Sequence, residues 1–339
     1  MKRLGLAFVL LALATTTGCR RKHATVVEAG ADAAAVLPSA MPTKPPPEYS
    51  APEAAAGDVF LIAPSSVIHI DPKGKVTREA KTSLLDITAG PGGDFYGLTT
   101  TDIRKLTKGV WKPYGKHGDK TATALILAKG PVSFRVTPGA RATGFHILTP
   151  TQLWEGALDE NLAIGGEHGL SNAQLDGAGH PWGISLGSKL VTRKLTDYES
   201  PSWTPVAPLA FAARSGKGAF ALTADRVVFN APDDTRISVT LPFTATAETV
   251  MRVGPTDVCV VRSNDQLAFV TPNGGLAKAT AKLSDVWTVD GRGRIWTLEG
   301  GDLDVIGVAG HVIATKKLAA AMKPAEVTRL VVFGSGASL

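Results

Sequence analysis

The sequence predicts an all-β protein: a seven-bladed β-propeller with four-stranded blades, whose ring is closed by the C-terminal strand completing blade 1. Three observations predict this fold. One segment recurs with a period near 38 residues, short strands alternate with glycine-containing turns, and one strand is left over at the C-terminal end. Such a period without a helical pattern is typical of propellers in which each repeat supplies one sheet.

The repeat consists of a glycine-containing turn followed by a short strand with a large residue. Its clearest copy is residues 293–296, and residues 179–182, 93–96 and 57–60 match it. Aligned on the large residue, the seven anchors are Phe60, Tyr96, Phe145, Trp182, Phe220, Cys259 and Trp296. Their spacings are 36, 49, 37, 38, 39 and 37 residues, and we attribute the long one to an insertion near residues 121–131.

Two blades illustrate the expected plan. In blade 7 the strands are expected at residues 285–289, 294–298, 303–306 and 311–315, with the first turn at 290–293. In blade 4 they are expected at residues 173–175, 181–184 and 189–192, with a fourth strand near Trp203.

The two ends of the repeat array predict how the ring closes. Before Asp58 the chain has no strand pattern, so blade 1 lacks a first strand, whereas residues 327–336 have the pattern of a first strand and its turn with no blade after them. We therefore expect the C-terminal strand to complete blade 1, which removes exposed sheet edges. The alternative, a stacked sandwich of seven strand groups, leaves that strand without a place.

The pattern D-x-x-G-x-x-W occurs at Asp290, Gly293 and Trp296, in the clearest copy of the repeat. It resembles the blade repeats of two-component-regulator and NHL-type propellers, and the resemblance extends over residues 58–339. This motif is shared by many functions, so the resemblance implies the fold and no particular activity.

The N-terminus carries a targeting signal. Lys2 and Arg3 precede an apolar run at residues 4–14 that is too short to span a membrane, which suits a secretory signal. The following Thr16-Thr17-Gly18-Cys19 resembles a bacterial lipoprotein signal, which implies that residues 1–18 are removed and Cys19 is acylated. Ordinary signal cleavage with a free Cys19 thiol is the alternative.

The lipoprotein resemblance also implies a location. A lipid on Cys19 would anchor the chain in the cell envelope, and Arg20 stands where enteric bacteria use Asp to retain lipoproteins at the inner membrane. We expect the outer membrane of a Gram-negative bacterium, with the propeller facing the periplasm or the cell surface.

Residues 19–57 are rich in Ala and Pro and show no apolar period, so they are predicted to form a disordered, lipid-anchored tether before a propeller at 58–339. As a flexible coil, such a tether reaches roughly 30–37 Å.

Composition excludes some classes of protein. The formal charge of +6 includes Lys2 and Arg3, which belong to the signal, and no stripe of basic and aromatic residues is present, so nucleic-acid binding is not expected. The chain has 2 cysteines, and if Cys19 is acylated then Cys259 has no disulfide partner within the chain. Cys259 lies in an apolar strand pattern and is expected to be a buried thiol.

No strong catalytic motif is present, and we expect no cofactor and no bound metal. Residues 214–219 faintly resemble a phosphate-binding loop, but they lack its first Gly and its Ser or Thr after Lys. The turns between first and second strands should share one face of the ring, and they carry a mostly cationic set that could attract an acidic partner. The cations of that set are Arg141, His180, Lys217 and Arg294, and its acidic member is Asp94. Alternatively, these side chains are polar because turns are solvated.

On the opposite face, the first strand of each blade should begin near the central channel. Four polar residues fall there, namely Asn172, Glu248, Asp285 and Glu326, with Asp86 nearby. Propeller lactonases hold a divalent cation with oxygen ligands in such a position, and hard cations prefer these ligands. The offsets of the four residues from the next glycine differ, which argues against convergence on a metal.

Three functions are therefore open. The leading hypothesis is a membrane-anchored envelope lipoprotein whose propeller binds or scaffolds a protein partner in the envelope without catalysis. The alternatives are a metal-dependent hydrolase or lyase at the channel mouth, and a sensor of a small ligand or glycan.

Overall fold

The computed structural model describes residues 47–128, 131–138, 144–158, 163–194, 197–205, 207–231, 234–319 and 326–338. Cys19, the signal segment, most of the predicted tether and Arg141 lie outside these ranges. Within them, no helix is long and apolar enough to cross a membrane.

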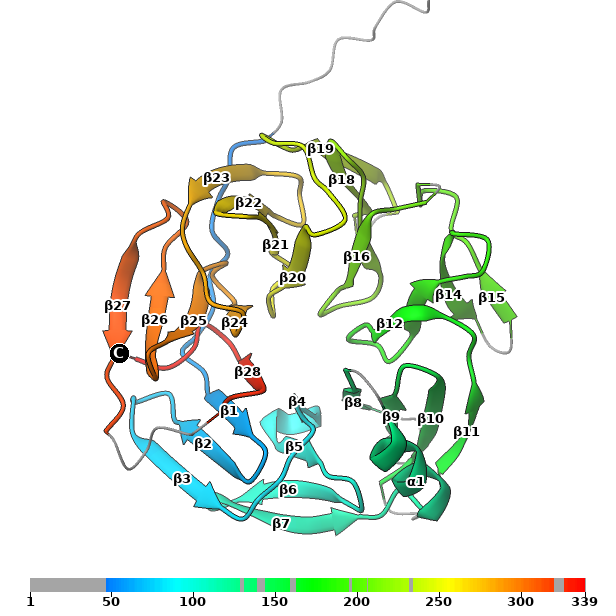
Figure 1. Ribbon diagram of the computed structural model, residues 1–339, viewed down its shortest axis with the longest axis vertical. Coiled ribbons are helices and arrows are strands. Elements are labelled where there is room, and N and C mark those ends of the chain that lie inside the picture. The colour runs from blue at the N-terminus through cyan, green and yellow to red at the C-terminus, as the bar shows by residue number, and fades with distance from the viewer. Residues whose placement is uncertain are drawn as a thin grey trace, which may run out of the picture. The chain divides into compact units, whose positions relative to one another are not determined.

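Seven four-stranded antiparallel sheets form a closed ring around a central channel (Figure 1). From the channel outward, blade 1 contains β28 (Arg329–Val332), β1 (Val59–Ala63), β2 (Ser66–Ile70) and β3 (Val76–Ala80). Blade 2 contains β4 (Asp86–Ala89), β5 (Phe95–Leu98), β6 (Ile103–Thr107) and β7 (Val110–Gly115). Blade 3 contains β8 (Ser133–Thr137), β9 (Gly144–Leu148), β10 (Gln152–Ala157) and β11 (Ala163–Glu167). Blade 4 contains β12 (Ser171–Leu175), β13 (Pro181–Ile184), β14 (Leu190–Lys194) and β15 (Asp197–Glu199).

The remaining blades follow the same order. Blade 5 contains β16 (Ala210–Ala213), β17 (Ala219–Leu222), β18 (Arg226–Asn230) and β19 (Arg236–Thr240). Blade 6 contains β20 (Val250–Val253), β21 (Cys259–Ser263), β22 (Gln266–Val270) and β23 (Leu276–Thr280). Blade 7 contains β24 (Trp287–Val289), β25 (Ile295–Glu299), β26 (Asp302–Ile306) and β27 (Val312–Lys316). The predicted all-β, seven-bladed propeller is confirmed.

The predicted ring closure is confirmed as well. Strand β28 pairs antiparallel with β1, with Val332 opposite Val59 and Leu330 opposite Leu61. Leu330 and Val332 are buried in one apolar cluster with Trp296 of blade 7. The C-terminal strand therefore joins the last blade to the first.

All seven anchors are buried on the second strand of their blades. Five of them pack toward the following blade, as Trp296 does against residues of blade 1. Phe145 and Cys259 pack instead toward the preceding blade, against Tyr96 and Phe220 respectively. Neighbouring side chains on a strand point to opposite faces. The reversed packing of Phe145 and Cys259 therefore means that these two weaker copies were aligned wrongly by one residue.

Two further details differ from the prediction. The insertion forms a helix, α1 (Asp119–Leu127), whose Leu125 packs in the cluster between blades 2 and 3. Its apolar residues are consecutive rather than spaced by three or four, so they showed no helical period. The fourth strand of blade 4 is β15 and does not lie near Trp203, which packs instead on Trp182 at 6.0 Å between ring centroids.

The part of the predicted tether that the structure describes, residues 47–57, lies along the propeller. Glu48 forms a parallel bridge with Leu276, and the ring of Tyr49 lies 6.5 Å from that of Phe269. Ala55 accepts a hydrogen bond from the backbone N–H of Ser335 at 2.8 Å. This segment therefore packs on blades 6, 7 and 1.

Candidate functional site

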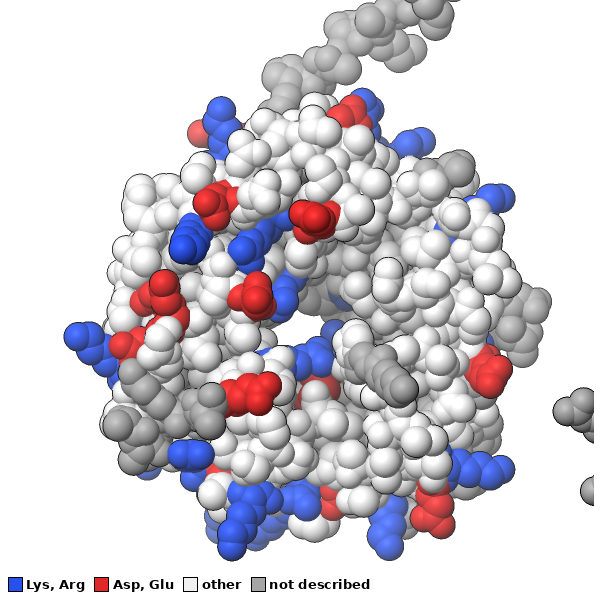
Figure 2. All heavy atoms as spheres, in the orientation of Figure 1, with Lys and Arg blue, Asp and Glu red and all other residues white. Residues whose placement is uncertain are grey.

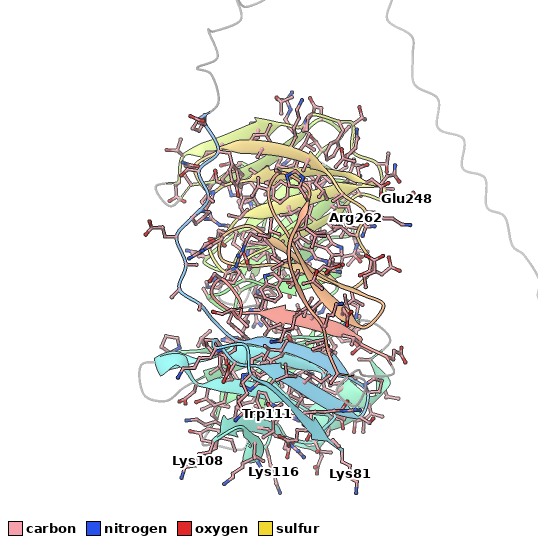
Figure 3. The ribbon with its side chains drawn as sticks, turned by 90° about the vertical axis from the view of Figure 1, so that its left-hand side faces the viewer. Lys81, Lys108, Trp111, Lys116, Glu248 and Arg262 are labelled. Atoms are coloured by element: carbon pink, nitrogen blue, oxygen red, sulfur yellow. The ribbon has the colours of Figure 1, made fainter. Side chains whose placement is uncertain are left out.

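Antiparallel strands define two faces of the ring. The turns between first and second strands lie on one face, here named the turn face, and the first strands begin on the other, the mouth face. In Figure 3 Glu248 and Arg262 lie on the side that faces the viewer in Figure 2, whereas the N-terminal segment runs along the opposite side. Because Glu248 comes just before β20, Figure 2 shows the mouth face.

The turn face of blades 4 and 7 is built on two buried aspartates. Asp290 Oδ1 accepts hydrogen bonds from the backbone N–H groups of Arg292 and Arg294, at 2.8 and 2.9 Å. Its Oδ2 accepts from Trp296 Nε1 at 2.9 Å and from Arg294 Nε at 2.8 Å. The aspartate thus joins the turn to the buried indole.

Asp176 repeats this arrangement in blade 4. It accepts hydrogen bonds from the backbone N–H groups of Ala178 and His180 and from Trp182 Nε1, at 3.0, 2.9 and 3.1 Å. The D-x-x-G-x-x-W pattern is therefore the sequence form of a buried hydrogen-bond network.

These networks engage two of the predicted turn-face residues. The Arg294 guanidinium also donates to the carbonyl of Ser335 at 2.5 Å, and the His180 ring lies 3.4 Å from Asp176 Oδ2. Lys217 is exposed, and Arg141 is outside the described residues. The structure thus gives Arg294 and His180 roles within the fold.

Both ends of the described chain lie on the turn face of blades 7 and 1. Gly291 in the blade 7 turn donates a backbone hydrogen bond to Gly334, and Gly57 donates to Gly336 at 2.9 Å. A Cβ on Gly291 would lie 2.8 Å from the Ala54 side chain, which shows how closely the N-terminal segment packs. Part of the turn face is therefore covered by the chain itself.

The four predicted mouth-face residues are exposed. They are Asn172, Glu248, Asp285 and Glu326, and their side chains have no hydrogen-bond or ion-pair partner among the described residues. No three His, Cys, Asp or Glu residues in the described ranges are grouped so that they could hold a metal ion. In Figure 2 several acidic residues lie near the central opening, apart from one another.

The fifth predicted residue, Asp86, is fully buried at the start of β4. It accepts hydrogen bonds from the backbone N–H groups of Ile87 and Phe134, at 2.8 and 2.9 Å. Arg329 Nη2 lies 3.2 Å from its Oδ1. Asp86 therefore ties blades 1, 2 and 3 together instead of reaching a ligand at the rim.

The channel interior is basic. Arg329 of β28 extends past blade 2 and donates to the carbonyl of Val132 in the connection to β8 at 2.8 Å, and its side chain is 34% exposed. Basic side chains are visible inside the central opening in Figure 2.

Two further arginines come from innermost strands. Arg252 of β20 stacks on Trp287, with its guanidinium carbon 4.7 Å from the ring centroid, and donates to the Trp287 carbonyl. Arg135 of β8 donates to the carbonyl of Phe134 at 2.8 Å. Neither has a carboxylate partner among the described residues.

The charge of Arg329 affects the pKa of both other arginines. Burial, with smaller contributions from the charges of Arg329 and Arg262, lowers the pKa of Arg252 to about 10. Burial also lowers the pKa of Arg135, and the charge of Arg329 contributes, whereas Asp86 opposes the effect. Arg329 therefore interacts with both of the other two across the channel.

These arginines were not among the site residues predicted from the sequence. The available signal was an arginine within each of three apolar first-strand segments, at positions 135, 252 and 329. A basic residue in a short apolar strand is uncommon unless the strand edges a polar space.

The scan against protein-family models finds no match, and neither does the comparison with curated proteins. Among solved structures, PorZ, a bacterial surface component of the type-IX secretion system of Porphyromonas gingivalis, is similar with a TM-score of 0.53 and 11% identity. The match covers 81% of this chain and 39% of that one. A streptogramin B lyase gives a TM-score of 0.48 and 10% identity over 72% of this chain and 88% of that one. AztD of Citrobacter koseri gives 0.42 and 10% over 83% and 99%. At such identities the likeness shows the propeller fold alone.

Proposed function

We propose that this chain is a lipid-anchored protein of the bacterial envelope whose propeller binds a protein partner on its mouth face, without catalysing a reaction. Cys19 would carry the lipid, and the outer membrane is the proposed location. The Asp-to-Trp turns of blades 4 and 7 support the resemblance to two-component-regulator and NHL-type repeats.

One observation supports the mouth face over the turn face. Of the residues predicted from the sequence, the four on the mouth face are exposed and without partners among the described residues. On the turn face, Arg294 and His180 contact buried aspartates, and Lys217 is exposed. Residues 47–57 and 333–338 occupy the turn face of blades 7 and 1, so a partner there would have to displace them.

The chemistry of the rim indicates the kind of partner. Glu248, Asp285 and Glu326 are exposed carboxylates that come just before the first strands β20, β24 and β28 on the mouth face. Complementary potentials steer association, so the docking surface of the partner should be basic.

The experiment is a crosslinked pull-down of the full-length protein from intact envelopes, compared with three variants. Cys19→Ser removes the anchor, and the triple variant Glu248→Gln, Asp285→Asn, Glu326→Gln neutralises the rim. A control, Asp234→Asn with Lys217→Gln, changes exposed charges on the turn face.

We expect one stoichiometric partner that is captured by the wild type and the control and lost from the rim variant. Loss from Cys19→Ser would further support anchoring. Equal capture by the rim variant and the wild type would refute mouth-face docking.

A further inference from the structure

The channel interior carries more positive than negative charge. The charge of Arg329 acts on both Arg135 and Arg252, and the buried carboxylates of Asp86 and Asp176 act on Arg135. The oxygens of Asp86 already accept two backbone hydrogen bonds in addition to contacting Arg329. No carboxylate acts on Arg252 among the described residues, so the three arginines outnumber the two buried carboxylates that act on them.

The guanidinium groups are held in place. Arg252 is stacked on Trp287, and Arg329 is bound at both ends, to the Val132 carbonyl and to Asp86. Arg135 is held by the Phe134 carbonyl. A guanidinium has five N–H donors, and the bonds found here use one on Arg135, one on Arg252 and two on Arg329, so donors remain on all three.

Keeping like charges together in a partly buried space costs stability. Carboxylate and phosphate groups match the planar fork of arginine and form short, charge-assisted hydrogen bonds with it. A bound oxyanion would therefore offset the repulsion of Arg329 with Arg135 and with Arg252, and it would use donors that are already oriented.

We propose that the central channel binds a small oxyanion, a carboxylate- or phosphate-bearing molecule, between Arg135, Arg252 and Arg329. This site is distinct from the proposed protein-docking surface and does not depend on it. The carboxylates around the mouth repel long polyanions, which favours a ligand with one or two negative charges over nucleic acid or an acidic polymer.

The test is isothermal titration calorimetry of the purified full-length protein with inorganic phosphate and, separately, with succinate, both at fixed ionic strength set with chloride. Arg252→Gln is the decisive variant. Arg252 has no carboxylate partner in the described residues, so its removal leaves no buried carboxylate without its ion-pair partner. Arg329→Gln is the second variant, and Lys217→Gln, which removes one exposed positive charge on the turn face, is the control. Thermal melts of each variant establish that it is folded.

We expect the wild type and Lys217→Gln to bind one equivalent of phosphate or succinate, and Arg252→Gln to bind about tenfold or more weakly. Binding of phosphate alone would identify a phosphate-bearing ligand, and binding of succinate alone a carboxylate. The proposal is overturned if the wild type binds neither anion, or if folded Arg252→Gln binds as tightly as the wild type.

Discussion

The buried carboxylate of Asp290 provides the sharpest test of how the blades are held. Replacing it with Ala removes the acceptor for four donors: two backbone N–H groups of the turn, the Arg294 guanidinium and the Trp296 indole N–H. Trp296 is fully buried, so its N–H would be left without an acceptor or water. Arg294 is 24% exposed and can regain water.

The expected loss follows from these contacts. A buried donor left unsatisfied costs about 1–3 kcal/mol, and losing hydrogen bonds to a charged acceptor costs about 1.5–3 kcal/mol more. We therefore expect Asp290→Ala to lower the free energy of unfolding by about 3–5 kcal/mol.

Asp71 provides a matched control. Its carboxylate also binds two turn N–H groups, those of Lys73 and Lys75 at 3.0 and 2.9 Å, but it holds no buried indole. Asp71→Ala should cost about 1 kcal/mol. Asp290→Asn should be intermediate, because its amide oxygen can still cap the turn while its NH₂ faces the indole N–H.

Equilibrium urea unfolding followed by fluorescence measures these differences, provided that the m-value stays constant. If Asp290→Ala loses no more stability than Asp71→Ala, the link between the buried indole and the aspartate is not what stabilises blade 7.

Three further outcomes are expected. Deleting residues from 326 onward removes β28 and exposes the edge of β1. The cooperative thermal transition seen by circular dichroism should then disappear. A melt like that of the full chain would contradict ring closure. Burial raises the pKa of the Cys259 thiol, so a thiol reagent at pH 8 should label Cys259 only after denaturation, and rapid labelling of the native protein would refute its burial. Burial, with a smaller contribution from Asp290, raises the pKa of Tyr49 to about 12 from 10, so folding stability should fall between pH 10 and 12 as the unfolded phenol ionises first. Tyr49→Phe should remove that part of the loss, and an unchanged pH dependence would show that the phenol does not contribute.

Much of the fold could be predicted because its signals are local. The turn from Asp290 to Gly293 and the buried Trp296 recur in partial form along the chain, and alternation along each strand separates buried from exposed positions. The alignment was wrong for two weak copies of the repeat. At Phe145 and Cys259 a shift of one residue reversed the side of the sheet that the anchor faces.

The sequence indicated where the mouth-face residues lie, and their role as a site stays a prediction. Each of the four comes just before or at the start of a first strand, and the structure shows them exposed. Their expected neighbour Asp86 is fully buried and bonded within the fold, since it lies inside the channel wall rather than on the rim. Nothing in the sequence distinguishes these two fates for a carboxylate at the start of a strand.

The sequence by itself determined the seven-bladed ring and its closure, because strand period, turn chemistry and the spare C-terminal strand are properties of short segments. Only the tertiary structure decided which side chains meet in the channel. Arg135, Arg252 and Arg329 come from three blades and interact only because the closed ring brings their innermost strands together. The tertiary structure also decided that residues 47–57 cover part of the turn face. This depends on contacts with residues near 334, which are distant in the sequence and which no local pattern encodes.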